Sequence, residues 1–145
     1  MVIEKAVEVS DELLAALADL IPQLPPKKTP PGREELTAIL KSPNTSLLLA
    51  RAPDKNSQIV GVLTLVIYRV PTGVRSIIED IVVDHKFRRQ GIAKALLSRA
   101  IHLAREAGAG NVSLTSNPSR QEANLLYQRL GFQLRNTNAY ILNLK

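Results

Sequence analysis

The sequence has no cysteine and no tryptophan, and its 145 residues include only three tyrosines and two phenylalanines. Without cysteine, the chain can form no disulfide, no thiolate metal site and no cysteine nucleophile. The few aromatic rings offer little surface on which bases could stack, so we do not expect a nucleic-acid partner. The two histidines and the scattered acidic residues have no metal-ligand spacing, so we expect no metal site.

The sequence also lacks long apolar runs. None approaches the ~20 residues that a transmembrane helix requires. The N-terminal stretch MVIEKAVEVSDELL carries charges where a signal peptide would have an apolar core. We therefore expect a soluble, cytoplasmic protein with no membrane partner.

The formal net charge is +6, yet the positive residues do not form one block. A group of them surrounds Gly91 within ten positions: His85, Lys86, Arg88, Arg89 and Lys94. Such a group produces a local positive field that suits a phosphorylated small molecule. A generally basic surface without a specific ligand is the alternative.

Hydrophobic periodicity and turn residues predict an alternating order of strands and helices. The expected strands are 2–7, 46–51, 58–68, 74–83, 111–115, 132–134 and 139–144. The expected helices are a first one, capped by Ser10, whose apolar face runs from Leu13 to Leu20, and then 33–41, 91–107 and 120–130. Residues 21–32 contain five prolines and predict an irregular surface loop. We expect one α/β (α+β) domain over residues 1–145, with a mixed sheet covered by helices on both faces.

The segment HKFRRQGIAKALL joins the strand 74–83 to the helix 91–107. Gly91 allows the backbone to approach a ligand, and Ala93 keeps the first helical turn open. The helix N-terminus and the guanidinium groups of Arg88 and Arg89 suit phosphate oxygens. Neither a Walker loop nor a G-x-G-x-x-G fingerprint is present, which disfavours kinase and Rossmann interpretations.

This segment resembles the coenzyme A binding motif Q/R-x-x-G-x-G/A of the GNAT superfamily of N-acetyltransferases, through Arg88, Gly91 and Ala93. A second segment, ANLLYQRLGF at 123–132, looks like that family's A-x-x-L-Y-x-x-x-G-F helix and turn. The resemblance implies a mostly antiparallel sheet of six to seven strands, four flanking helices and a parallel strand pair that splays apart. It also allows a homodimer.

The resemblance further implies that acetyl-CoA is the cosubstrate and that it binds in the opening of the splayed pair. The pantetheine arm would pair with backbone near Ile81 and Val83, and the pyrophosphate would rest on the turn 88–93. The cofactor-binding residues implied in this way are Ile81, Val82, Val83, Arg88, Arg89, Gln90, Gly91, Ile92, Ala93, Lys94, Arg120, Asn124 and Tyr127.

The implied reaction is direct transfer of acetyl to a primary amine, without a covalent enzyme intermediate. Tyr127 matches the family tyrosine near the sulfur, where a phenol can protonate the departing thiolate. Tyr127 could instead be an ordinary core tyrosine. Glu79 is the first candidate for the base and Asp80 the second, although Asp80 should point to the opposite face unless a bulge intervenes. Each of the two could instead be a solvated or ion-paired carboxylate.

Arg120 departs from the family pattern, which often has asparagine at this position. It could bind an anionic group of the acceptor or a coenzyme A phosphate, or it could lie at the surface. Asn124 lies one helical turn further on.

The acceptor has no signature. We favour a small-molecule amine, and the Glu79–Asp80 pair is similar to the corresponding strand of the glucosamine-6-phosphate N-acetyltransferase branch. The alternatives are a protein-amine acetyltransferase, a coenzyme A-binding protein without activity, and a basic nucleic-acid or protein-binding module.

Overall fold

The computed structural model describes residues 1–145 and divides into two compact units, residues 1–115 and residues 116–145. The association of both units in one domain stays a prediction.

The first unit contains five strands, three α-helices and two short 3₁₀ helices, η1 and η2. In chain order they are β1 (Val2–Lys5), α1 (Asp11–Leu20), η1 (Ile21–Gln23), α2 (Arg33–Lys41), β2 (Thr45–Arg51), β3 (Ile59–Val70), β4 (Gly73–Val83), η2 (His85–Phe87), α3 (Ile92–Glu106) and β5 (Val112–Leu114). The second unit contains α4 (Gln121–Arg129). The predicted helices and strands up to residue 130 are therefore present, with small differences at their ends. The predicted irregular surface loop 21–32 is corrected at its start, where Ile21–Gln23 form η1 and Ile21 and Leu24 are buried in the core. No helix has the length and hydropathy that crossing a membrane requires.

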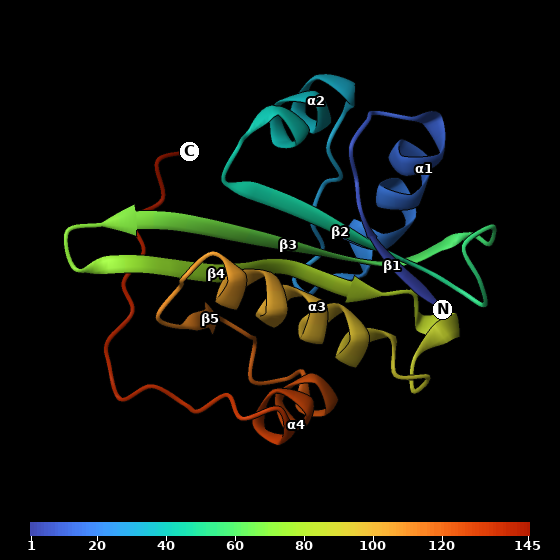
Figure 1. Ribbon diagram of the computed structural model, residues 1–145. Helices are drawn as coiled ribbons and strands as arrows, with labels where there is room; N and C mark the ends of the chain where they lie inside the picture. Colours follow the sequence, from blue (N-terminus) through green and yellow to red (C-terminus); the bar gives the residue numbers. More distant parts are fainter. The chain divides into compact units, whose positions relative to one another are not determined.

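The five strands form one sheet in the order β1-β2-β3-β4-β5 (Figure 1). Every neighbouring pair is antiparallel except β4 and β5, which are parallel. This arrangement confirms the predicted mixed, mostly antiparallel sheet with four helices. The strand count is five, however, and not six to seven.

The predicted strands at 132–134 and 139–144 are wrong, because residues 132–145 form neither helix nor strand. Their large apolar side chains are exposed, Tyr140, Ile141 and Leu142 among them. Strand preference measures how well side chains fit a pleated, half-buried surface, and a strand also needs a partner for its backbone groups. The apolar composition of this segment does not supply that partner.

Helices cover both faces of the sheet in the first unit (Figure 1). One face packs against α1 and α2 through a cluster that includes Leu17, Leu36 and Val62. The helix α3 lies on the opposite face, where the position of a Cβ on Gly61 would be 3.3 Å from Leu96 Cδ1. Ala100 and Leu97 of α3 are fully buried. The sheet is therefore the middle layer of the unit, and α3 starts beside the end of β4.

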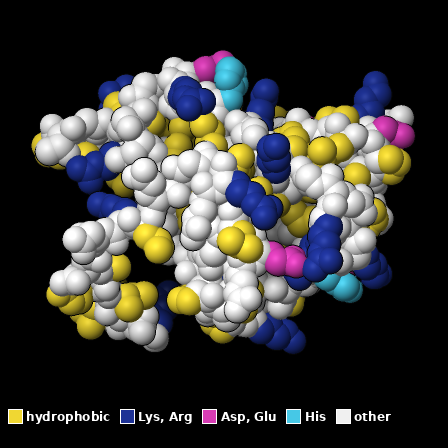
Figure 2. Space-filling view, turned by 90° about the horizontal axis from the view of Figure 1, so that it is seen from below, with side chains coloured by type: hydrophobic (Ala, Val, Ile, Leu, Met, Phe, Trp, Pro, Cys, Tyr) yellow, Lys and Arg dark blue, Asp and Glu magenta, His cyan; other side chains and the backbone are white.

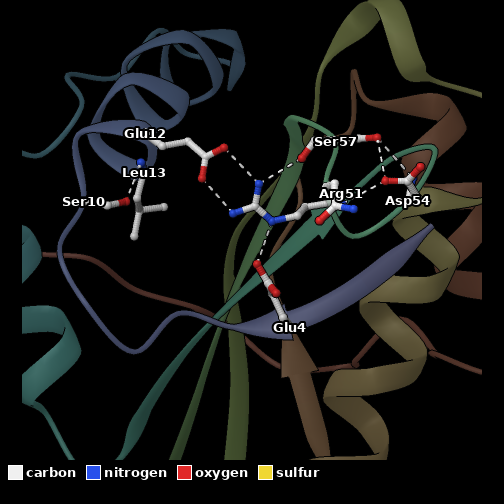
Figure 3. Close-up of polar contacts among 8 residues, drawn as sticks. Glu4, Ser10, Glu12, Leu13, Arg51, Asp54 and Ser57 are labelled. Atoms are coloured by element: carbon white, nitrogen blue, oxygen red, sulfur yellow. Dashed lines mark hydrogen bonds and ion pairs between the residues drawn. The ribbon is translucent and has the colours of Figure 1, made fainter.

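Arg51 joins three elements at the end of β2 (Figure 3). Its Nε donates to Glu4 of β1 at 2.7 Å, and its two Nη atoms donate to both carboxylate oxygens of Glu12 in α1 at 2.9 and 2.7 Å. Nη1 also donates to the carbonyl of Ser57 at 2.9 Å. The hydrogen bond to Arg51 is the main reason that the pKa of Glu12 is lowered. The Arg51 side chain is only 16% exposed, whereas the side chains of Glu4 and Glu12 are 42% and 54% exposed. The guanidinium is thus the buried partner of these charge-assisted bonds.

We predict that Arg51→Gln lowers the free energy of unfolding by about 1–2 kcal/mol at neutral pH. Because the folded-state pKa of Glu12 is lowered, the contribution of this ion pair is complete above the ordinary glutamate pKa. It is lost as the pH falls through the lowered value. Thermal unfolding at a series of pH values should therefore show a difference from wild type that shrinks in acid.

The control is Arg33→Gln, which breaks an ion pair with Asp11 whose side chains are 57% and 94% exposed. We expect this variant to lower the free energy of unfolding by less than about 0.5 kcal/mol. Equal decreases in the free energy of unfolding for the two variants would contradict the role given to Arg51.

Candidate functional site

Strand β4 contains a bulge in the middle of its pairing with β3. Glu79 pairs with Thr64 and Val82 pairs with Val62, so two residues of β4, Asp80 and Ile81, face a single residue of β3. Asp80 takes the left-handed conformation, with φ 51°. Such backbone is uncommon outside glycine, although aspartate tolerates it better than most residues.

The bulge changes which side chains β4 exposes. Glu79 and Asp80 are both exposed, and the next three residues, Ile81 to Val83, are all buried. From the sequence, Glu79 and Asp80 were expected to point to opposite faces unless a bulge intervenes. The structure contains that bulge.

Beyond the bulge, one edge of β4 has no neighbouring strand. The parallel pairing with β5 ends at Ile78 and Leu114, whereas β4 continues to Val83. The N–H of Asp84 donates to Val60 of β3 at 2.8 Å. Because backbone groups alternate along a strand, those of Val83 and Ile81 face the open edge and those of Val82 face β3.

The turn after β4 brings basic side chains to this edge. Nε of Arg88 donates to the carbonyl of Val83 at 3.2 Å, and the carboxylate of Asp84 accepts the N–H of Lys86 at 3.0 Å. Gln23 of η1 also holds the turn, because its Oε1 accepts the N–H of His85 at 3.0 Å. Sequence reasoning missed Gln23, and no local signal links it to a residue so distant in the chain.

The helix α3 begins without a side-chain cap. Its N-cap is Gly91, which has φ 79° and no side-chain oxygen, and no acidic residue lies in the first turn. The first intrahelical bond is from the N–H of Ala95 to Gly91, so the N–H groups of residues 92–94 have no partner within the helix. Together with the positive end of the helix dipole, these groups can bind an anion.

The positive charges of the turn also favour an anionic ligand. Lys86, Arg88, Arg89, Gln90 and Lys94 are exposed, Ala93 is half-buried, and Ile92 is buried. Figure 2 shows Lys and Arg side chains at separate places across the face that it presents, and not in one continuous block. No three His, Asp or Glu side chains come together in a way that could hold a metal ion.

The second unit gathers the other predicted site residues around α4. Tyr127 is 6% exposed, and its ring meets Phe132 edge-on at 6.0 Å. Burial raises the pKa of the Tyr127 phenol, and the nearby positive charge of Arg120 partly offsets this effect. Ser116, like Arg120, lowers the pKa of Tyr127. The buried Oγ of Ser116 makes no hydrogen bond of standard geometry.

The amide of Asn124 has a structural partner. Its Nδ2 donates to the carbonyl of Asn117 at 3.1 Å, which fixes the turn before α4. Arg120 is the N-cap residue of α4 and lies two helical turns before Tyr127. Their spacing of seven residues puts both on one face of the helix.

The model of the acetyltransferase (GNAT) family matches residues 13–132, which is most of the sequence. The chain belongs to the GNAT family of acetyltransferases. This match confirms the resemblance that the two motifs predicted.

The chain is also similar to individual proteins. A 51-residue segment is 43% identical to N-acetyltransferase 8 of Homo sapiens and covers 35% of this chain, but it spans only 22% of the human protein. The crystal structure of a probable acetyltransferase superposes with a TM-score of 0.84 at 24% identity, covering 100% of this chain and 99% of that chain. The aminoglycoside acetyltransferase meta-AAC0020 from an uncultured soil metagenomic sample, in complex with sisomicin, superposes with a TM-score of 0.81 at 22% identity. That match covers 99% of this chain and 96% of that chain. At these identities the two structures show a shared fold.

We predict that the pKa of the Tyr127 phenol lies above the ordinary tyrosine value, because burial favours the neutral form. Arg120→Gln should move the titration higher still, because it removes the positive charge that favours the phenolate. The measurement is tyrosinate absorbance against pH, with the curve of Tyr127→Phe subtracted. Arg129→Gln, also on α4, is the matched control and should leave the titration unchanged. A Tyr127 component at or below the ordinary tyrosine value would contradict the prediction.

Proposed function

We propose that this protein transfers acetyl from acetyl-CoA directly to the primary amine of a small molecule. The observation that carries the proposal is the meeting of two features in the first unit. The open edge of β4 has backbone groups available for an amide-bearing chain, and the uncapped N-terminus of α3 has N–H groups available for phosphate. Family membership supports the same assignment.

The two features fit the two parts of the proposed donor. The amides of the pantetheine arm would pair with backbone groups of Ile81 and Val83, as an added strand does. The pyrophosphate would accept hydrogen bonds from the turn 88–93, with Lys94 beside it. Arg88 holds the Val83 carbonyl in the free protein, and in this proposal it moves to the phosphate when the arm takes that carbonyl.

The proposed chemistry is attack of a neutral amine on the thioester carbonyl. The new C–N bond forms, the C–S bond breaks, and a backbone N–H on the open edge, at Ile81 or Val83, stabilises the oxyanion. The N–H of Val82 is less suitable, because it faces β3. Holding the amine and the thioester together supplies most of the rate enhancement.

Two protons must move in this reaction. The amine loses one to a carboxylate of the bulge, Glu79 or Asp80, directly or through water. The coenzyme A thiolate gains one from Tyr127. A tyrosine phenol is protonated near neutral pH, which is the form that a proton donor needs. Burial raises the pKa of Tyr127, which makes the phenol a weaker acid.

We favour a small-molecule acceptor for one further reason. The exposed carboxylates of Glu79 and Asp80 can bind an amine that arrives from solvent.

The donor site can be tested with two glycines that flank α3. Gly91 and Gly108 both have φ 79°, and a Cβ on either would meet nothing within 4 Å. Substitution by alanine therefore imposes a similar backbone strain, about 1 kcal/mol, at both ends of the helix. We predict that only Gly91→Ala weakens coenzyme A binding, by about tenfold in calorimetric titration, because relief of the strain re-aims the N–H groups of the first turn. Equal weakening in both variants would refute the site.

The reaction can be tested at Tyr127. We predict that Tyr127→Phe lowers kcat by about 10²-fold and changes the KM for acetyl-CoA little, because the phenol acts on the leaving group. Tyr140→Phe is the control, since that side chain is 90% exposed on the same unit. An unchanged kcat in Tyr127→Phe would end the general-acid role. Tight coenzyme A binding with no transfer to any amine of a broad panel would favour a binding protein without activity.

A further inference from the structure

The loop between η1 and α2, residues 24–32, is held beside the candidate site. At its start, Gln23 bonds the N–H of His85, and Leu24 is buried. At its end the chain enters α2, whose Leu36 is fully buried in the core cluster. The loop is therefore attached at both ends.

One side chain of this loop reaches the bulge of β4. Nζ of Lys28 lies 3.7 Å from Oδ1 of Asp80, and the two side chains are 50% and 44% exposed. An ion pair this exposed contributes little to stability and is readily exchanged for a ligand. The bulge and the left-handed backbone of Asp80 present the carboxylate to solvent at this point.

The side chain of Lys28 ends in an ammonium group, and a protonated acceptor amine is also an ammonium group. Under the proposed function, on which this inference rests, the acceptor approaches the carboxylates of the bulge. An acceptor ammonium that pairs with Asp80 takes the place of the Lys28 ammonium. Lys28 is then left beside a like charge, which disfavours binding unless the acceptor brings an anion.

The composition of the loop sharpens this requirement. From Ile21 to Gly32 the only charged residues are Lys27 and Lys28, so the loop itself contains no acidic residue that could take over the pairing. We infer that the acceptor is an amine that carries its own anionic group, a carboxylate or a phosphate, a few bonds from the nitrogen. Asp80 binds its ammonium group, and Lys28 binds its anion. The same arrangement discriminates against simple monoamines and polyamines.

The test compares matched acceptors that share an amine and differ in the anion. One pair is β-alanine and its amide, which tests the carboxylate. The other is glucosamine 6-phosphate and glucosamine, which tests the phosphate. We expect wild type to prefer the charged member of at least one pair by about tenfold in kcat/KM, and Lys28→Gln to remove most of that preference. Lys28→Arg should retain it, and Lys27→Gln, with the same change of charge one residue away, should leave it unchanged.

A binding measurement separates failure of this inference from failure of the proposed function. Thermal shifts with coenzyme A present are recorded for the same four compounds on wild type and Lys28→Gln. A shift by a charged member that Lys28→Gln abolishes supports the inference, even where no acetyl transfer occurs and the proposed reaction fails. The inference is overturned if transfer or binding shows no preference for the charged members, if Lys28→Gln keeps the preference, or if none of the four compounds is acetylated or bound.

Discussion

The bulge of β4 and the early end of β5 impose the constraint on which the candidate site depends. A strand of eleven residues pairs with β5 over only three positions, Ser76 to Ile78. The hydroxyl of Ser76 donates to the carbonyl of Asn111 at 2.7 Å and helps to fix that short pairing. After it, β4 contains an extra residue and the two exposed carboxylates of Glu79 and Asp80, and the backbone groups of Ile81 and Val83 face an edge without a strand. A regular sheet would satisfy those groups internally and leave nothing for a ligand to pair with.

The basic turn gives this edge its charge preference. Arg88 already bonds the end of β4, Gly91 begins α3 without a competing oxygen, and Gln23 fixes the start of the turn. Backbone donors thus serve both parts of the proposed donor, and backbone groups do not depend on side-chain rotamers. Side chains are then needed mainly for proton transfer and for choosing the acceptor, as proposed for Tyr127, Asp80 and Lys28.

The sequence predicted the parts of the site that depend on local pattern. The turn from Arg88 to Ala93 was placed correctly at the start of a helix, because its glycine and basic residues stand beside a strong amphipathic pattern. The bulge could only be stated as a condition, since strand register depends on the partner strand as well. The proximity of Lys28 and Asp80 had no local signal at all. The C-terminal strands were wrong because apolar residues such as Ile141 and Leu142 indicate strand preference, and a strand also requires a neighbour.

The central claim is that the open edge of β4 and the first turn of α3 bind one ligand together. Amide hydrogen exchange of the uniformly labelled protein, followed by NMR during titration with coenzyme A, tests this claim most directly. The account predicts slower exchange at Ile81 and Val83 and at residues 92–94, with little change at Val82, which already faces β3. Coenzyme A binding that protects amides elsewhere and leaves Ile81, Val83 and the first turn of α3 unchanged would contradict it.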